Sequence, residues 1–309
     1  MSVLAVLSAL VPVFLLIVTG VLARRLLVTD DAHWIGVERL IYYLLFPALL
    51  IATLARADLT RVPVEEVGGV LFASVLIMSV LLLALRPLLM ALMDGPAFTS
   101  VFQGATRWQT FIALAVAGNL YGSLGLALAS VAAVAMIPVL NIVSVWVLAR
   151  YAAPRPPRWQ DVLLQIAKNP LIWSCIIGIS LNLTHVPIPG PIYAFADAMG
   201  RAALPLGLLL VGAGLQLSAL MRPSPAMLVS TGLKLVVMPV IAIALARTVG
   251  TSGPPLAVIA CCAAVPSASG AYVLAKQMGG DTRLMAAILT LETMLAIVTM
   301  PIVIELSLR

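Results

Sequence analysis

Apolar residues fill long uninterrupted stretches of this 309-residue chain, and charged or Pro/Gly-rich segments separate the stretches. A helix needs about 20 apolar residues to cross the hydrocarbon core of a bilayer. We therefore expect an all-α membrane protein with ten transmembrane helices. They are predicted near residues 3–23, 34–55, 67–85, 101–120, 124–149, 170–183, 202–217, 226–246, 255–278 and 284–307.

A polar linker divides the predicted helices five and five. It combines three prolines with Arg155, Arg158 and Lys168. The predicted organisation is a first five-helix repeat over 1–150, a cytoplasmic linker over 151–169 and a second repeat over 170–309. An odd number of helices per half gives the halves opposite orientations in the membrane, so the second repeat is expected to be inverted.

Two pairs of proline motifs support the repeat. LLFPALL (44–50) corresponds to ALPLGLLL (203–210), and AMIPVLN (135–141) corresponds to VTMPIVI (298–304). Inverted repeats are a transporter architecture in which the substrate site lies near the bilayer midplane, where interrupted helices meet.

Composition agrees with a membrane protein that carries no soluble domain. The chain is 62% hydrophobic and 10% charged, against roughly 45–50% and about 25% in soluble domains. Ten spans leave no room for an ATPase or kinase module, and the sequence contains no phosphate-binding GxxxxGK[ST] or GxGxxG loop. The net charge of +6 is attributed to the loops rather than to nucleic-acid binding.

The distribution of basic residues predicts the orientation. No basic residue precedes the first apolar stretch and two follow it, which is the reverse of a signal peptide. With the N-terminus outside, twelve basic residues lie on or near the cytoplasmic side and five outside, as the positive-inside rule favours. The cytoplasmic set is Arg24, Arg25, Arg39, Arg86, Arg107, Arg150, Arg155, Arg158, Lys168, Arg222, Lys276 and Arg283; the outer set is Arg56, Arg61, Arg201, Arg247 and Arg309. We expect a multi-pass inner (plasma) membrane protein with both termini outside.

The ninth apolar stretch is interrupted at its middle by Pro266, Ser267, Ser269 and Gly270. Proline removes a backbone donor and glycine adds conformational freedom. Unwound backbone at membrane depth is tolerated where protein or a water-filled cavity surrounds it. The half-helix that follows would offer free N–H groups to an anion. The alternative is a simple proline kink whose hydroxyls bond back to the helix.

The corresponding stretch of the first half, 106–122, contains polar residues but no proline. Gln109 and Thr110 could supply amide and hydroxyl donors to a bound solute, and Asn119 interrupts the apolar pattern further along. The alternative is that Gln109 marks the cytoplasmic end of the helix beside Arg107.

Two ionisable residues lie within predicted helices, where burial is costly and a functional role is the default hypothesis. Glu292 and Lys234 each lie about eight residues from a predicted helix end, roughly 12 Å into the membrane. Such a coupled pair could shuttle a proton. The alternative is a structural ion pair, or a hydrogen-bonded glutamic acid that holds two helices together.

Other polar residues indicate no further chemistry. Asn141 and Asn182 are interpreted as helix–helix hydrogen bonders, and His33 and His185 lack metal-ligand spacing. The three cysteines, Cys175, Cys261 and Cys262, lie in apolar stretches and are interpreted as small hydrophobic residues. With no GxSxG or HExxH motif, we expect neither an enzyme nor a metal or cofactor.

Five segments in order resemble the signatures of the auxin efflux carrier family, which includes bacterial permeases and the plant PIN-FORMED carriers. They are LVPVFLLIVTGVLARR (10–25), LIYYLLFPALLIATLA (40–55), ALPLGLLLVGAGLQL (203–217), LKLVVMPVIAIALA (233–246) and PSASGAYVLAKQMGGD (266–281). The resemblance implies ten helices in two inverted repeats, a fold similar to bile-acid symporters and sodium/proton antiporters, with helices four and nine broken and crossing. It also implies secondary transport of small organic anions and a homodimer.

The match is incomplete at the crossing. Where the family often has an NTGFIGLP-like segment in helix four, this chain reads QTFIALA (109–115), which keeps Thr110 and lacks the proline. In helix nine Pro266 and Ser269 fit, whereas Gly270 stands where Asn is frequent. The long cytoplasmic loop of the plant carriers is missing, which indicates a bacterial-type permease.

The resulting hypothesis is a secondary carrier that moves a small mono- or dicarboxylate by alternating access, with Glu292 as proton carrier. The expected substrate-binding residues are Gln109, Thr110, Asn119, Pro266, Ser267, Ser269 and Gly270, and the proton-coupling candidates are Glu292 and Lys234. The alternatives are a passive channel on the same scaffold and a non-transporting receptor or assembly subunit.

Overall fold

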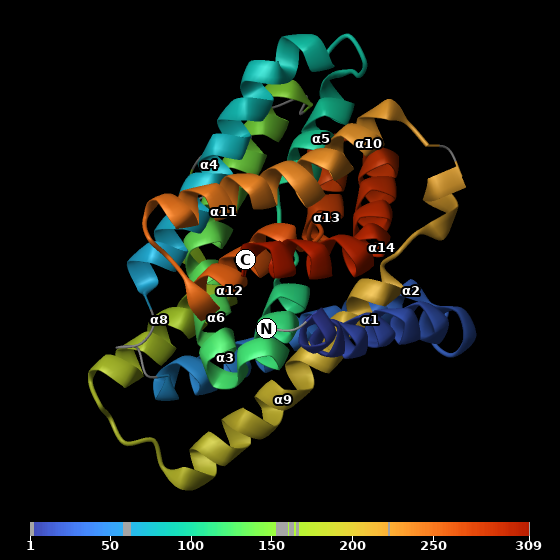
Figure 1. Cartoon of the computed structure of the whole chain (residues 1–309). Coiled ribbons are helices and arrows are strands. Elements are labelled where there is room, and N and C mark those ends of the chain that lie inside the picture. The colour runs from blue at the N-terminus through green and yellow to red at the C-terminus, as the bar shows by residue number, and fades with distance from the viewer. Residues whose placement is uncertain are drawn as a thin grey trace.

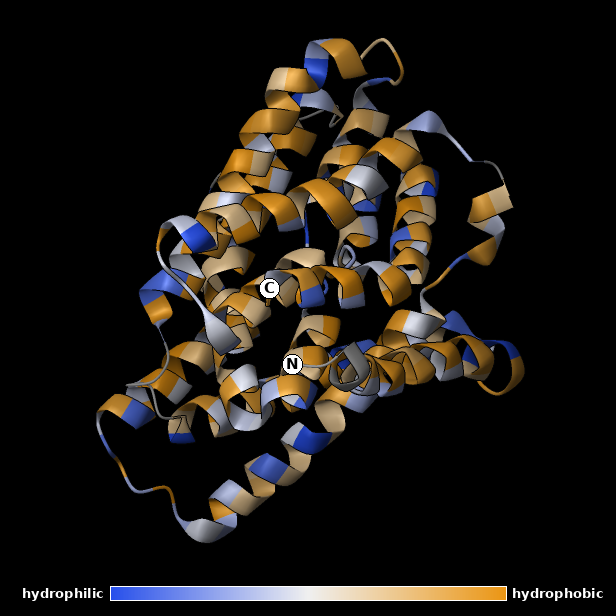
Figure 2. Cartoon of the chain, in the orientation of Figure 1, coloured by the Kyte–Doolittle hydropathy of each residue, from blue (hydrophilic) through white to orange (hydrophobic). Residues whose placement is uncertain are grey.

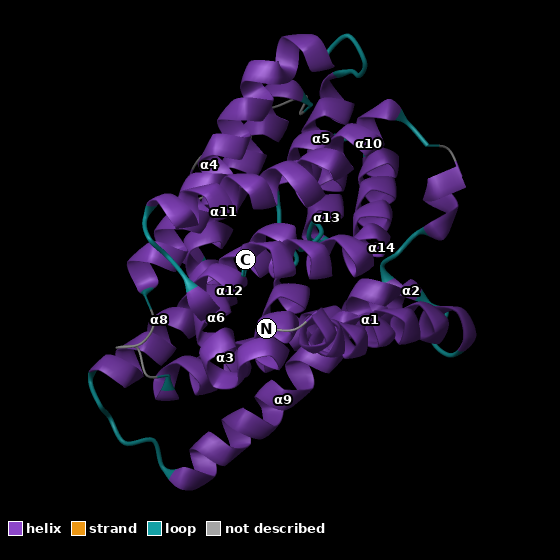
Figure 3. Ribbon diagram, in the orientation of Figure 1, coloured by secondary structure: helices purple, strands orange, loops and turns teal. Residues whose placement is uncertain are grey.

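The computed structural model describes residues 3–57, 63–152, 160, 164, 167–221 and 223–308. Every regular element in these residues is a helix (Figure 3). Seven helical segments are long and apolar enough to cross a membrane, and two shorter apolar helices accompany them. Apolar residues make up most of the helices (Figure 2). The protein is a multi-pass membrane protein.

The first half of the chain contains α1 (Val3–Leu26), α2 (Asp31–Leu40), the π-helix η1 (Ile41–Leu45), α3 (Phe46–Arg56), α4 (Val64–Leu89), α5 (Gly95–Thr106) and α6 (Thr110–Tyr151). The second half contains α8 (Pro170–Leu183), α9 (Gly190–Ala213), the 3-10 helix η3 (Leu217–Met221), α10 (Pro225–Gly232), the π-helix η4 (Leu233–Val237), α11 (Met238–Thr248), α12 (Gly253–Ala264), α13 (Gly270–Met278) and α14 (Thr282–Ser307).

The helices form two groups (Figure 1). In the view shown, α1, α3, α8 and α9 lie together at the bottom, and α4, α5, α10 and α11 lie together at the top. In the first group α1 packs on α9, and α3 packs on both α8 and α9. In the second, α4 packs on α6 and α11, and α12 packs on α14.

Glycines allow close backbone contact between α1 and α9. A Cβ atom on Gly212 would lie 1.9 Å from the carbonyl oxygen of Ile17, and one on Gly20 would lie 2.1 Å from that of Leu209. In a membrane, where helix association depends on close packing rather than on the hydrophobic effect, small residues favour such contacts. The two halves of the chain are therefore joined by a tight helix pair.

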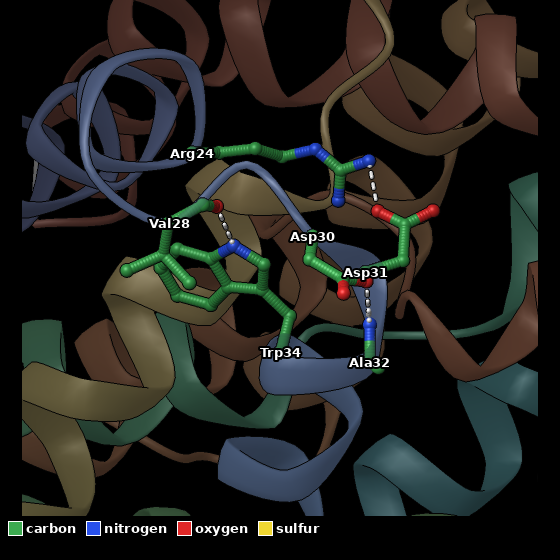
Figure 4. Close-up of polar contacts among 6 residues, drawn as sticks. All are labelled: Arg24, Val28, Asp30, Asp31, Ala32 and Trp34. Atoms are coloured by element: carbon green, nitrogen blue, oxygen red, sulfur yellow. Dashed lines mark hydrogen bonds and ion pairs between the residues drawn. The ribbon is translucent and has the colours of Figure 1, made fainter.

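The turn from α1 into α2 is held by polar contacts (Figure 4). Arg24 pairs with Asp31, and the Trp34 indole Nε1 donates to the Val28 carbonyl at 2.7 Å. The Asp30 carboxylate caps α2 by accepting from the Ala32 N–H at 2.8 Å. This turn fixes the direction in which α2 leaves.

Each π-helix is followed directly by an α-helix whose second residue is proline. η1 precedes Pro47 and η4 precedes Pro239. Proline lacks an N–H and clashes with the carbonyl one turn earlier, so the preceding turn widens. Lys234 lies in one of these widened turns.

One predicted helix has the wrong bounds, and another predicted boundary falls at a kink. The helix expected over 202–217 begins at Gly190 and ends at Ala213. The polar residues Asp197 and Arg201, which suggested a loop, pair at 2.6 Å one turn apart on the helix surface. The boundary expected between the helices over 101–120 and 124–149 coincides with a kink of α6 at Gly122, whose φ of 59° requires glycine.

Several predictions concern residues outside those that the structure describes. They include most of the expected linker, with Arg155 and Arg158, and the orientation assigned to Arg61, Arg222 and Arg309.

Candidate functional site

Two helices of the second group are interrupted in the middle. Between α5 and α6 the backbone is extended at Arg107 (φ −71°, ψ 157°) and at Gln109 (φ −92°, ψ 99°). Between α12 and α13 it is extended at Val265 (φ −65°, ψ 149°), and α13 begins at Gly270. The second break lies where Pro266 predicted it, whereas the first forms without a proline. We call residues 107–109 the first break and 265–269 the second break.

A cavity of about 820 Å³ lies beside both breaks. The first helix group contributes Phe46 of α3 and Leu210 of α9, and η1, which leads into α3, contributes Tyr42 and Tyr43. The cavity is therefore bounded by both helix groups. The second group contributes residues from each break and from the adjoining turns of α6 and α13.

Four of the sequence-predicted site residues line this cavity: Gln109, Thr110, Ser269 and Gly270. Thr110 is the first residue of α6 and Gly270 the first residue of α13, so both half-helices begin at the cavity wall. No side chain caps either start. Helix N-termini with free N–H groups favour negative charge.

Arg107 and Trp108 also line the cavity, and the sequence analysis missed both as site residues. Arg107 Nη2 donates to Asn141 Oδ1 at 2.9 Å, while Nη1 is buried without a hydrogen-bond partner. Trp108 is 2% exposed, and its indole Nε1 is also unpartnered. The sequence predicted Arg107 among the cytoplasmic loop charges. The available signal was its position inside a predicted membrane helix, between the polar residues Thr106 and Gln109.

Three other predicted site residues lie away from the cavity lining. Asn119 is exposed, and its Nδ2 donates to the Ala9 carbonyl of α1 at 2.8 Å. Pro266 and Ser267 are buried within the second break. Their contribution to the site is the shape of the break rather than contact with the cavity.

Ser267 connects the second break to Glu292 of α14, which is fully buried. Glu292 Oε2 lies 2.9 Å from the backbone nitrogen of Ser267 and 2.6 Å from its Oγ. The same Oγ is within hydrogen-bonding distance of the Gly104 carbonyl in the last turn of α5. Ser230 Oγ of α10 lies 3.4 Å from Glu292 Oε1. Glu292 therefore contacts the second break directly, and Ser267 links it to α5, which precedes the first break.

Lys234 lies near this cluster and is also fully buried. It lies in η4, which packs against α14, the helix that carries Glu292. Its Nζ has no hydrogen-bond partner in the described structure. The two residues are neighbours rather than a hydrogen-bonded ion pair.

The remaining polar predictions have simple outcomes. Asn182 Nδ2 donates to the Leu54, Ala55 and Ala57 carbonyls, so it bonds two helices together as predicted. Asn141 lines the cavity and holds Arg107. The three cysteines are free and buried. Within the described residues, no group of three or more His, Cys, Asp or Glu is arranged to hold a metal ion.

A second cavity, of about 310 Å³, lies between α3, α9 and the kink of α6. Arg56, Ser123 and Tyr193 are among its lining residues. The Arg56 guanidinium lies 3.3 Å from the centre of the Tyr193 ring, so this cation already has an aromatic partner.

Comparison with known proteins gives one family. The family model described as "Membrane transport protein" matches residues 157–304, which include α8 to α13, the second break and Glu292. No curated protein matches the chain. The second half of the chain is thus similar to the membrane transport protein family, which is the family of the auxin efflux carriers.

Proposed function

We propose that the protein is a secondary transporter of small organic anions, and that the anion binds at the first break. The observation that carries this proposal is the pair of unpartnered donors, Arg107 Nη1 and Trp108 Nε1, in the wall of one cavity. Buried polar groups in proteins almost always have partners. Two orphaned donors in one cavity wall favour a ligand that supplies acceptor oxygens.

Charge favours an anionic ligand, because the lining of the cavity sets two cations, Arg107 and Lys168, against the carboxylate of Glu38. Arg107 has the neutral side chain of Asn141 as its hydrogen-bond partner, and a partly buried cation is costly unless it is paired. A guanidinium presents parallel N–H groups that match a carboxylate. The N-termini of α6 and α13 add further favourable potential at the same cavity.

The rest of the cavity wall suits an apolar or aromatic body attached to the carboxylate. Aromatic side chains gather around the break: Tyr42, Tyr43, Phe46, Trp108 and Phe111. Rings pack favourably against flat apolar ligands. We therefore propose aromatic or other small carboxylates as the substrate class, with Gln109, Thr110 and Ser269 as polar contacts.

We further propose that ten spans form two inverted repeats over 1–150 and 170–309. The 57-residue segment Gly95–Tyr151 is long enough for two spans. The short apolar helices α8 and α12 supply the rest together with the breaks. Helix contacts also correspond: α1 packs on α9 as α3 packs on α8. Under this relation the two breaks occupy equivalent helices, four and nine.

The two helix groups suit alternating access, in which one group moves against the other and the cavity between them changes sides. By the predicted orientation, with both termini outside the inner membrane, the cavity that Lys168 and Gln277 help to line faces the cytoplasm. We propose a homodimer with the lipid bilayer around it and no nucleic-acid partner.

Thermal-shift measurements on the detergent-purified protein test the binding site. Benzoate, indole-3-acetate and malate are the probes, because a ligand that binds the folded state raises its apparent stability. We expect a shift that is lost in Thr110→Ala and Ser269→Ala and kept in Ser123→Ala, which alters the second cavity. A shift that survives both cavity variants would place the anion elsewhere.

Counterflow in proteoliposomes then tests transport. A carrier exchanges labelled for unlabelled benzoate through one alternating site, so we expect transient accumulation of label against unlabelled solute. Uptake without counterflow would instead indicate a passive channel, and binding without uptake would indicate a receptor.

A further inference from the structure

Ser267, Glu292 and Gly104 form a buried cluster at the second break. If Glu292 were ionised, this cluster would have too few hydrogens for its contacts. Ser267 Oγ contacts two oxygens, the Gly104 carbonyl and Glu292 Oε2. A serine hydroxyl carries one hydrogen, and a backbone carbonyl can only accept. The contact with Gly104 therefore uses the serine hydrogen, and the contact with Glu292 needs a second one.

The 2.6 Å separation between Ser267 Oγ and Glu292 Oε2 is a typical O–H···O distance. A protonated carboxyl group supplies the missing hydrogen, since it has one O–H donor and keeps acceptor capacity. Glu292 then donates to Ser267 Oγ, and Ser267 donates to Gly104. The Ser267 backbone N–H still donates to the same carboxyl group at 2.9 Å.

Close packing of α5 against α10 and α14 brings the groups of this hydrogen-bonded chain together. A Cβ atom on Gly104 would lie 2.1 Å from Ser230 Oγ and 2.8 Å from Ile288 Cγ2. The absence of a side chain at Gly104 lets α5 approach α10 and α14 closely enough for its carbonyl to reach Ser267. The cluster thereby links α5, which precedes the first break, to the second break and to α14.

The charged surroundings agree with a neutral acid. Of the elements that pack against α14, η4 carries the buried cation Lys234 and α12 carries the buried thiol of Cys262. α10 faces Glu292 with the Ser230 hydroxyl, and the second break faces it with Ser267. Lys234 Nζ lacks a hydrogen-bond partner. An ionised carboxylate beside it would be expected to draw the ammonium into an ion pair.

We propose that Glu292 carries a proton in this state, and that this acid, bonded through Ser267 to Gly104, is the proton-binding group of the transport cycle. The second part rests on the proposed function. A carboxylate bound at the breaks would repel an ionised Glu292, so the acid form is the one compatible with a bound anion. Proton and anion are therefore expected to bind together and to cross the membrane in the same direction.

Infrared difference spectroscopy of the purified protein tests the protonation itself, without substrate or transport. Near pH 7 exposed carboxyl groups are ionised, so a buried acid stands out by its C=O stretching band. We expect that band in the wild type and in Glu66→Gln, and its loss in Glu292→Gln. Glu66 is a matched control. Its carboxylate also accepts a hydrogen bond from a hydroxyl group, that of Thr251, but it lies at the surface.

Ser267→Ala separates a bonded acid from an isolated one. This variant keeps Glu292 and removes its hydroxyl acceptor, so the band is expected to persist and to shift to higher frequency. A wild-type spectrum that Glu292→Gln leaves unchanged would overturn the proposal.

Transport in proteoliposomes tests the coupling. With the acid solution outside, we expect wild-type vesicles to accumulate labelled benzoate several-fold more than protein-free vesicles, which report passive diffusion of benzoic acid. Glu292→Gln is expected to keep counterflow and to lose the gradient-driven excess. Counterflow with no such excess in the wild type would overturn the coupling and leave the proposed function intact. Absence of wild-type counterflow would overturn the proposed function, while the infrared result would still decide the state of Glu292.

Discussion

The two breaks interrupt their helices by different means. The first break has no proline, and Arg107, Trp108 and Gln109 line the cavity from it. The second break contains Pro266, and inside the protein its Ser267 bonds to Glu292 and to Gly104. The first break thus offers unpartnered donors, whereas in the second break Ser267 is bonded inside the protein and Ser269 lines the cavity. A break can therefore serve ligand binding alone or combine it with anchoring.

Removing the cation of the first break is expected to have the largest effect. In Arg107→Ala the carboxylate loses its charged partner, which costs about 2–5 kcal/mol, or about 30-fold to several thousand-fold in affinity. Titration calorimetry with benzoate measures the change. Arg107→Lys keeps the charge but loses the parallel N–H groups. Its affinity for benzoate should therefore lie between those of the wild type and Arg107→Ala. Unchanged affinity in Arg107→Ala would contradict the division between the breaks.

Removing the side chain that positions Arg107 is expected to weaken binding less. Asn141→Ala deletes the acceptor of the Arg107 Nη2 bond. Hydrogen bonds to charged groups contribute about 1.5–3 kcal/mol, so affinity should fall by roughly tenfold or more. Asn182→Ala, which removes a helix–helix bonder far from the cavity lining, is the control. Equal losses of affinity in the two variants would indicate a general effect on folding.

Within the second break, removal of the Ser267 hydroxyl should change stability rather than affinity. Ser267→Ala leaves buried oxygens of Glu292 and Gly104 without their shared partner, which costs about 1–3 kcal/mol. Thermal unfolding in detergent should show the lower midpoint, while benzoate affinity stays within a few-fold of the wild type. Ser123→Ala, at the wall of the second cavity, should leave the midpoint unchanged. A large loss of affinity in Ser267→Ala would mean that this hydroxyl contacts the ligand.

Replacing the proline should have the smallest effect. The first break forms without proline, so Pro266→Ala is expected to keep the second break and to lower stability by only about 0.4–1 kcal/mol, through the greater freedom of the unfolded chain. Unfolding midpoints and benzoate affinity check this together. If the variant lost binding altogether, proline rather than the Glu292 anchor would be what keeps the second break open.

Much of the fold followed from the sequence. The apolar stretches predicted an all-helical membrane protein, and Pro266 with its neighbours predicted an interruption that the backbone shows. These features are local, since they depend on the length of an apolar segment and on the missing N–H of proline. The helix start at Gly190 was misjudged because the Asp197–Arg201 pair, one turn apart, makes a helix look polar.

The site itself depended on contacts between distant segments. The sequence contained Arg107, yet a loop charge and a cavity cation look alike until the break between α5 and α6 is seen beside Tyr42 and Asn141. Asn119 looked equally suitable and instead bonds to α1. Glu292 and Lys234 were recognisable as buried ionisable residues. Whether they form an ion pair or a protonated acid is a matter of a few ångströms and of one hydroxyl hydrogen, which only the packing of α5, α10 and α14 around Ser267 decides.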